Sequence, residues 1–137
     1  MTIEVTDNMT IETLRKLFSD RYPFLTIEFY AAPHRWQEES SFEHLLSHHK
    51  TIGEIRTIHH PGALEIHSWQ KTGAVEQAFS KRLGLNMQVF RHQGGHWVQT
   101  AGTDALTLEE QNEIGKKATI DYKTIGGDSI TQSYNLY

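Results

Sequence analysis

Two segments of the chain align with each other, and this internal similarity limits the possible folds more than any other feature. Residues 13–30 read TLRKLFSDRYPFLTIEFY and residues 74–90 read AVEQAFSKRLGLNMQVF. Both contain Phe-Ser, an Arg two residues later, a helix-breaking residue, a Leu and an alternating strand, with one residue of slack after the breaker. The sequence therefore predicts two β-α-β units and an internal duplication over about 2–31 and 63–92. The alternative is that short helix–strand pairs simply look alike.

Helical spacing and capping residues place the helices. Apolar residues at helical spacing follow Thr10 and Thr72, which predicts long helices over 10–21 and 72–83, each started by its threonine. Two further Thr residues have Glu three positions later, the spacing of a capping box: Thr51 with Glu54, and Thr107 with Glu110. Alternating, β-branched and aromatic stretches predict strands at 2–6, 25–30, 63–69, 85–91 and 96–101.

These elements predict an α+β fold. A β-α-β unit crosses over right-handed and places its helix on one face of the sheet. Two such units predict a mixed sheet of about five strands with helices mainly on one face. We expect a single α+β domain over 1–118, followed at 119–137 by a C-terminal hairpin or a flexible extension.

Composition excludes several classes of protein. The chain has 137 residues, a formal net charge of −4 and no cysteine, so disulfides and thiolate chemistry are excluded. No large basic block is present, which argues against nucleic acid as a partner. No stretch has the apolar length of a membrane span, and the first residues lack the features of a signal peptide. These features predict a cytoplasmic protein without membrane contact.

One part of the sequence resembles a known family. VFR, a glycine turn, WVQT, a TD pair and TLEEQN follow one another after TIGEIRTI and GLNMQVFR. This order is similar to that of a small family of uncharacterised bacterial proteins of the Bacteroidetes type, and the resemblance covers most of residues 10–117. The family has no established activity, so the resemblance implies no catalytic residue. His92 stands where family members carry a different turn.

Nine histidines raise the hypothesis of a divalent metal such as zinc or nickel. Capping-box spacing between Ser40 and Glu43 predicts a short helix at 41–48. On that helix His44 and His48 have the i, i+4 spacing that lets two imidazoles share one ion. The alternative is a solvated polar face, and the sequence contains no third ligand at a metal-site spacing.

A second candidate site is a ligand site formed by two loops. If the two halves are equivalent, their strands deliver similar residues to one sheet edge: His34, Arg35 and Trp36 from the first half, and Arg91, His92, His96 and Trp97 from the second.

The turn at Gly94-Gly95 decides how that second set is arranged. A two-residue type I′ loop would pair His92 with Trp97 and place His92 and His96 on opposite faces. A three-residue loop with a bulge would instead make His92 and His96 direct neighbours across the strands. The Gly-Gly pair is compatible with both turns, and we favour the two-residue loop.

Two classes of function follow. The sequence favours a non-enzymatic binding or interaction domain that contacts itself, as a homodimer, or another protein, through exposed aromatic residues such as Trp36, Trp69 and Trp97. For any one of these Trp residues, a place in the core is the alternative, and the one that residue type favours. If Leu64 and Ile66 face the core, His67 and Trp69 face away from it. The alternative is a metal- or small-ligand-dependent enzyme that uses the His and Arg residues of 34–36 and 91–97. The sequence identifies no catalytic residue, cofactor or substrate.

Overall fold

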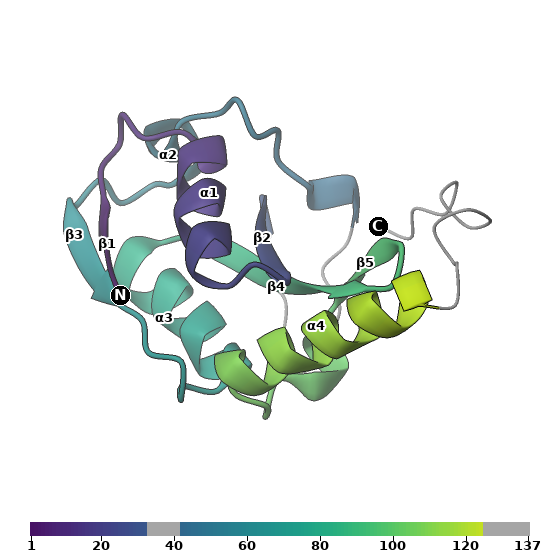
Figure 1. The fold of residues 1–137 in the computed structure, drawn as a ribbon. Helices are drawn as coiled ribbons and strands as arrows, with labels where there is room; N and C mark the ends of the chain where they lie inside the picture. Colours follow the sequence, from purple (N-terminus) through teal and green to yellow (C-terminus); the bar gives the residue numbers. More distant parts are fainter. Residues whose placement is uncertain (33–41, 125–137) are drawn as a thin grey trace.

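The chain alternates strands and helices through both halves, as the computed structural model shows for residues 1–32 and 42–124 (Figure 1). The elements in order are β1 (Thr2–Val5), α1 (Ile11–Arg21), β2 (Leu25–Tyr30), α2 (Ile52–Ile55), β3 (Gly62–Glu65), α3 (Thr72–Leu83), β4 (Asn86–Gln93), β5 (His96–Gln99) and α4 (Leu108–Thr124). Short 3-10 helices lie at Phe42–His44 and Ala101–Thr103.

The strands form two antiparallel sheets. Strand β1 pairs with β3, and β2, β4 and β5 form the second sheet in the order β2-β4-β5. The prediction of an α+β fold with five strands is confirmed, but the prediction of one mixed sheet is wrong. The strands before and after α1 lie in different sheets, and so do the strands before and after α3. The reason is that β1 pairs with β3 and β2 pairs with β4, each with the equivalent strand of the other half.

The pairing of counterparts relates the two halves by an approximate twofold axis. In the first sheet Ile3 lies opposite Leu64, and in the second Glu28 lies opposite Gln88. Glu28 and Gln88 are equivalent in the alignment of the two segments, and Ile3 and Leu64 become equivalent when the spacing between Phe18 and Phe79 is extended back to the first strands. Equivalent residues that contact each other across an antiparallel pair are what a twofold axis produces.

Backbone hydrogen bonds outside the regular elements repeat in the same way. In each half, the start of the first helix bonds to the loop before the second helix, and the start of that second helix bonds to the turn before the first. At the start of the first helix, Ile11 N to Lys50 O (3.0 Å) is equivalent to Thr72 N to Leu106 O (2.8 Å), and Glu12 N to His48 O (3.1 Å) is equivalent to Gly73 N to Asp104 O (3.0 Å). At the start of the second helix, Ile52 N to Met9 O (2.8 Å) is equivalent to Leu108 N to Gln70 O (3.0 Å), and Gly53 N to Asp7 O (3.0 Å) is equivalent to Glu109 N to Ser68 O (3.0 Å). This repeated geometry supports an internal duplication.

The hydrophobic core lies where the two halves meet. Helices α1 and α3 contribute Phe18 and Phe79, each 0% exposed and each at the same position of its helix. Around them pack apolar residues from all four strands of the two halves: Ile3, Val5, Leu25, Ile27, Phe29, Leu64, Met87 and Val89. Both halves are needed to bury this apolar surface, since neither contains a closed core of its own.

Most of the predicted helix starts are confirmed. Thr10 caps α1 by accepting from Thr13 N (3.2 Å). Both predicted capping boxes are present, at Thr51 with Glu54 and at Thr107 with Glu110. The prediction that Thr72 caps α3 is wrong: Lys71 stands at the cap without a side-chain bond, and the Thr72 hydroxyl donates instead to Leu106 O (2.9 Å).

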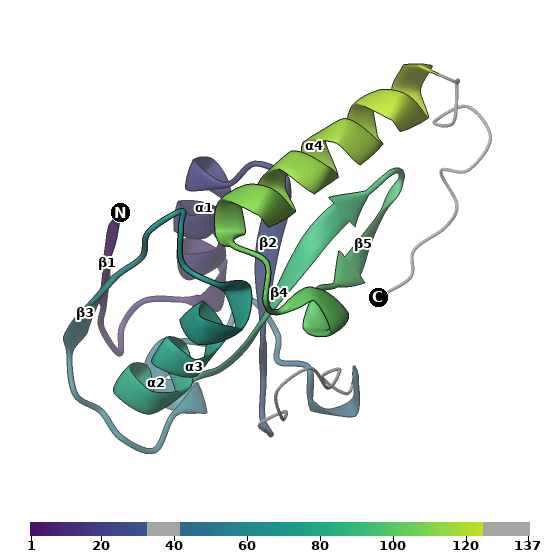
Figure 2. The same cartoon turned by 90° about the horizontal axis from the view of Figure 1, so that it is seen from below.

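Helix α4 continues past residue 118, where we expected the domain to end, and lies along the β4–β5 hairpin (Figure 2). Residues 119–124 continue this helix, so they do not begin a separate hairpin or extension. The Gly-Gly pair of the predicted C-terminal hairpin lies outside the described residues. The close approach of α4 depends on Gly115, where an added Cβ would lie 3.0 Å from Phe24 Cβ and 3.1 Å from the carbonyl oxygen of His92.

We expect Gly115→Ala to lower the free energy of unfolding by about 1–2 kcal/mol. The added methyl meets backbone at His92, which cannot move as a flexible side chain can, and this crowding outweighs the gain of about 1 kcal/mol in helix propensity. Urea unfolding followed by circular dichroism measures the change. Gly102→Ala is the control, because a Cβ there has no atom within 4 Å, and it should be neutral. A stabilised Gly115→Ala protein would contradict the expected contact.

Candidate functional site

A row of polar side chains crosses the β2–β4 pair at the twofold axis. Glu28 and Gln88 face each other across the strands, and both are buried, at 1% and 0% exposure. On each side, one residue from a helix and one from a loop complete a cluster at equivalent positions. This polar row consists of Arg15, Glu28 and His48 in the first half and Glu76, Gln88 and Asp104 in the second.

In the first half, Arg15 and His48 enclose the carboxylate of Glu28. Nε2 of His48 lies 2.6 Å from Glu28 Oε1, and Nη2 of Arg15 lies 3.4 Å from Glu28 Oε2. Nη1 of Arg15 lies 3.1 Å from Nδ1 of His48. A guanidinium can only donate, so Nδ1 accepts and the proton of the neutral ring is on Nε2, from which it is donated to Glu28.

Arg15 also closes the outer edge of the sheet. Its Nε donates to the carbonyl of Ile27 (2.9 Å), and Nη2 donates to the hydroxyl of Thr26 (3.2 Å). Ser19 donates to the next free carbonyl along this edge, that of Leu25 (3.0 Å). An edge strand with satisfied carbonyls cannot pair with another chain, so α1 protects β2 from this kind of contact.

The second half carries two carboxyl groups at the equivalent positions. Oε2 of Glu76 accepts from the backbone of Val89 (2.8 Å) and from the amide of Gln88 (3.0 Å). Burial raises the pKa of Glu76 well above its usual value, and the charge of Asp104 and a hydrogen bond with Asp104 raise it further. Two carboxyl groups can be joined by a hydrogen bond only if one is protonated, and the raised pKa of Glu76 favours a proton on Glu76 that Asp104 can share.

The two clusters differ in their access to solvent. The side chain of His48 is 34% exposed, whereas Glu76 and Asp104 are 4% and 0% exposed. Both ring nitrogens of His48 are already engaged, one by Glu28 and one by Arg15. The first cluster therefore orients its imidazole but leaves neither nitrogen for a substrate or a metal ion in this conformation.

The structure does not form the predicted helix that would bring His44 and His48 together. His44 ends a three-residue 3-10 helix, and His48 lies in a turn beyond an isolated bridge at Leu45. The i, i+4 geometry that suggested a shared ion is therefore absent. Within residues 1–32 and 42–124, no three His, Asp or Glu side chains are grouped as a metal ion would require.

The hairpin has the register of a two-residue loop. Gln93 pairs with His96 and His92 pairs with Trp97, so His92 and His96 lie on opposite faces, as we favoured. The turn type differs from the prediction: of the two glycines only Gly94 has a positive φ, 65°, which is the pattern of a type II′ turn and not of type I′.

Two residues of the predicted ligand site hold α4 in place. Nη1 of Arg91 donates to Gln111 Oε1 (2.7 Å). Nδ1 of His92 lies 2.6 Å from the hydroxyl of Thr119, which itself donates to the carbonyl of Gly115, so Nδ1 is the donor. Burial lowers the pKa of His92, and the charges of His96 and Lys123 lower it further, so the ring is neutral at pH 7.

The predicted ligand residues are therefore divided. Arg91 and His92 bond to α4, and the indole of Trp97 contacts the His92 ring edge-on at 4.9 Å between centroids. His96 is half-buried beside the turn. Residues His34, Arg35 and Trp36 lie outside the described residues.

Sequence reasoning missed the polar row, although the sequence contained a signal for it. Glu28 and Gln88 are polar, stand at the same position of the two aligned segments and are each flanked by apolar residues on both sides. A polar residue repeated at one buried strand position indicates a conserved geometric role in both halves. The partners from helix and loop could not be found in this way, because their chemistry differs between the halves.

The comparisons with known proteins add no relative. No family model, curated protein or solved structure matches the chain. The resemblance to a Bacteroidetes-type family therefore stays a prediction. Among the helices that the structure describes, none has both the length and the apolar character needed to cross a bilayer.

Proposed function

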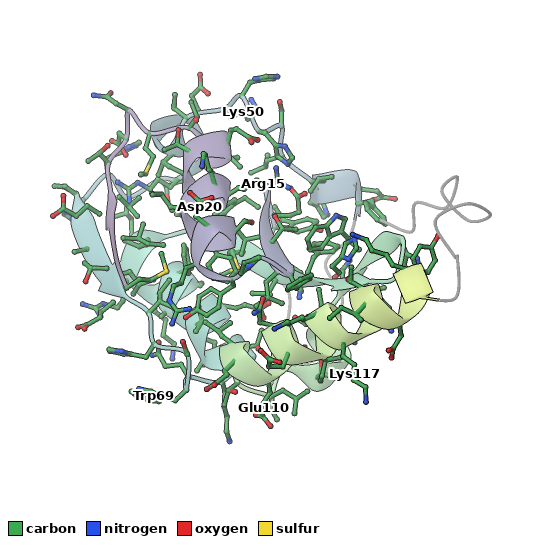
Figure 3. The ribbon with its side chains drawn as sticks, in the orientation of Figure 1. Arg15, Asp20, Lys50, Trp69, Glu110 and Lys117 are labelled. Atoms are coloured by element: carbon green, nitrogen blue, oxygen red, sulfur yellow. The ribbon has the colours of Figure 1, made fainter. Side chains whose placement is uncertain are left out.

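We propose that the protein is a non-enzymatic interaction domain whose contact surface centres on Trp69. The single observation that carries this proposal is the exposure of that side chain, 69%, the highest of any large apolar residue that the structure describes. Figure 3 shows the indole at the periphery of the molecule, away from the sheets. An indole in water is unfavourable, and Trp is enriched among the residues that dominate protein interfaces.

The loop that carries Trp69 is held rigidly. Gln70 N donates to His67 O (3.0 Å), and the side chain of Gln70 accepts from His67 N (2.8 Å). The carbonyl of Ser68 accepts from Glu109 N at the start of α4 (3.0 Å). A fixed loop loses little conformational entropy on binding, which favours its use as a contact surface.

The neighbours of Trp69 give the surface one stacked ring and a polar rim. The imidazole of His67 stacks on the indole, with ring centroids 5.1 Å apart and planes at 9°. Glu65 lies 3.4 Å from His67 Nε2. Arg21 donates to the Ser68 hydroxyl (2.9 Å) beside the loop. An aromatic centre with Arg and polar groups around it is the usual composition of a protein interface.

The alternative is an enzyme that uses the His and Arg residues of 34–36 and 91–97. Arg91 and His92 bond to α4, which favours a structural role for them. The interaction domain is therefore the better-supported function, with a second copy of the chain or another protein as partner. A cytoplasmic location and a bacterial origin are part of the same proposal.

We expect Trp69→Ala to weaken partner binding strongly while the fold stays intact. Truncation of an interface centre costs about 2 kcal/mol or more, which weakens binding roughly 30-fold. The free energy of unfolding should change by less than about 0.5 kcal/mol, since the side chain is exposed. Sedimentation velocity over a range of protein concentrations measures self-association. A photo-crosslinking residue at position 69, used in cells, captures a different partner, whose affinity for the purified wild-type and variant proteins is then measured.

Ile120→Ala is the matched control, because Ile120 is 52% exposed and lies on α4, outside this loop. The control should keep the wild-type affinity. The proposal fails if the wild-type protein stays monomeric and crosslinks from position 69 are no more specific than crosslinks from position 120. It also fails if Trp69→Ala binds a partner as tightly as the wild-type protein does.

A further inference from the structure

A pocket at the C-terminal end of α3 is lined by basic side chains. Its volume is about 200 Å³, and four of its lining residues carry or can carry positive charge: Arg56, His60, Lys81 and Arg82. Ser80 adds a hydroxyl group, and no carboxylate is among the lining residues. In a protein of net charge −4, this grouping of positive charge needs an explanation.

Arg56 is fixed at the edge of this pocket. Its side chain is 1% exposed, its Nη1 donates to Leu83 O (3.2 Å) and its Nε donates to Asp7 Oδ1 (3.0 Å). Nη2 lies 2.9 Å from that same oxygen and forms an ion pair with it, without the geometry of a hydrogen bond. Burial alone would raise the pKa of Asp7, but the hydrogen bonds and charges of Arg56 and His59 lower it overall. Asp7 therefore stays ionised at neutral pH and balances only Arg56 and His59.

The other half of the molecule shows that the scaffold does not require the charges of Arg56 and Lys81. At the equivalent end of α1, Asp20 stands in place of Lys81 and pairs with Lys16 (2.8 Å). Asn112 stands in place of Arg56 and accepts from Phe24 N (2.9 Å). Both helix ends carry an arginine, Arg21 and Arg82, but the end of α1 adds an acidic residue and a neutral amide where the end of α3 adds two further basic residues.

Helix capping does not account for the pocket either. Two carbonyls near the end of α3 are satisfied by the backbone, because Gly84 N donates to Ser80 O and Leu85 N to Phe79 O, both at 3.1 Å, and Arg56 Nη1 satisfies the last one, that of Leu83 (3.2 Å). The helix dipole favours cations in the last turn, which covers Lys81 and Arg82. Neither capping nor the dipole accounts for His60, which lines the same pocket from a different segment of the chain.

We infer that this pocket binds a small anion of the phosphate class, free or as a simple phosphate ester. Planar guanidinium groups match the oxygens of phosphate, and Lys supplies a mobile point charge. The volume is several times the roughly 30 Å³ share of one water molecule, so a phosphate with a small substituent fits. This inference is independent of the role of Trp69.

We expect inorganic phosphate to stabilise the protein and to bind with a stoichiometry of one. Thermal unfolding and isothermal titration calorimetry at constant ionic strength, adjusted with chloride, separate binding from screening. The double variant Lys81→Ala, Arg82→Ala should weaken phosphate binding at least tenfold. The control Lys50→Ala, Lys117→Ala removes the same charge from other elements, as Figure 3 shows for Lys50 and Lys117, and should bind as the wild-type protein does.

Backbone NMR on the wild-type protein keeps the inference testable if the double variant does not fold. Phosphate should shift the amide signals of Ser80 and Gly84 and leave those of the equivalent Ser19 unchanged. Methyl phosphate and vesicles containing phosphatidic acid then identify the source: tighter binding to the ester supports a small soluble ligand, and tighter binding to vesicles supports a lipid headgroup. The inference is overturned if phosphate produces no saturable binding, or if both double variants lose binding equally.

Discussion

Glu76→Ala should lower the free energy of unfolding by about 3–5 kcal/mol, although the residue is a carboxylic acid and not part of the apolar core. The change removes the acceptor of two buried donors, the backbone of Val89 and the amide of Gln88. It also leaves Asp104, which is 0% exposed, without the group that shares its proton. A buried polar network that loses one member costs more than the bonds it loses, because the remaining groups stay out of water. Chemical denaturation at neutral pH measures the loss.

The matched variant Glu76→Gln should be far milder and should change how stability depends on pH. Burial raises the pKa of Glu76 in the folded protein, so the folded state holds a proton that the unfolded state has released. Wild-type stability therefore falls as pH rises above the unfolded value of 4.5, by about 1.4 kcal/mol per pH unit, until the pH reaches the raised folded pKa. Glutamine keeps an acceptor for Val89 and a donor for Asp104 without titrating, so the stability of Glu76→Gln relative to wild type should increase with pH.

Other titrating groups are common to both proteins and cancel in this difference. The pKa of His92 is lowered by burial, so stability from His92 increases as pH rises towards the ordinary value of 6.5. The pKa of Asp7 is lowered, so its contribution is lost only in acid. A difference between wild type and Glu76→Gln that does not change with pH would show that Glu76 and Asp104 share no proton.

Phe79→Ala should cost about 3–5 kcal/mol, and Phe18→Ala should cost a similar amount. Each ring is 0% exposed and packs at the same position of its helix, Phe79 against Phe29 at 6.2 Å between centroids and Phe18 against Tyr22 at 5.2 Å. Truncation removes the transfer free energy of the ring and leaves a cavity that the fixed helices cannot close. Equilibrium unfolding of both variants measures the two losses.

The comparison between the two Phe variants tests the shared core. Because both rings belong to one core, we expect each variant to keep a single cooperative transition with an unchanged dependence on denaturant. Leu17→Ala, on the outer face of α1 at 40% exposure, should cost much less. Separate transitions for the two halves would contradict the single core.

Local elements could be predicted from the sequence because their signals are local. The capping boxes at Thr51 and Thr107, the cap at Thr10 and the register of the hairpin each depend on a few neighbouring residues. The predicted helix at 41–48 failed because tertiary contacts outweigh the capping signal there. Leu46 N bonds to Phe29 O at the edge of β2 (2.9 Å), which extends the chain where a helix was expected.

The partition of the strands between two sheets could not be predicted in the same way. Alternation shows that a strand exists but does not show which strand lies beside it. The rule for β-α-β units assumes that both strands enter one sheet, and here α1 joins strands of different sheets. Of the candidate site, the alignment contained a signal for Glu28 and Gln88 that sequence reasoning missed, whereas Arg15 and Glu76 differ in chemistry and share no pattern that a sequence comparison detects.

The pairing of Glu28 with Gln88 on the twofold axis has a consequence for the origin of the chain. In a dimer of two identical halves, a residue on the axis faces a copy of itself, and two buried glutamates would repel each other. A single chain that carries both halves can place an acid at one axial position and a neutral amide at the other. It can likewise carry an arginine, Arg15, in one cluster and an acid, Glu76, at the equivalent position of the other cluster. Fusion thus allows an asymmetric charge pattern on a symmetric scaffold, which two separate identical subunits could not adopt.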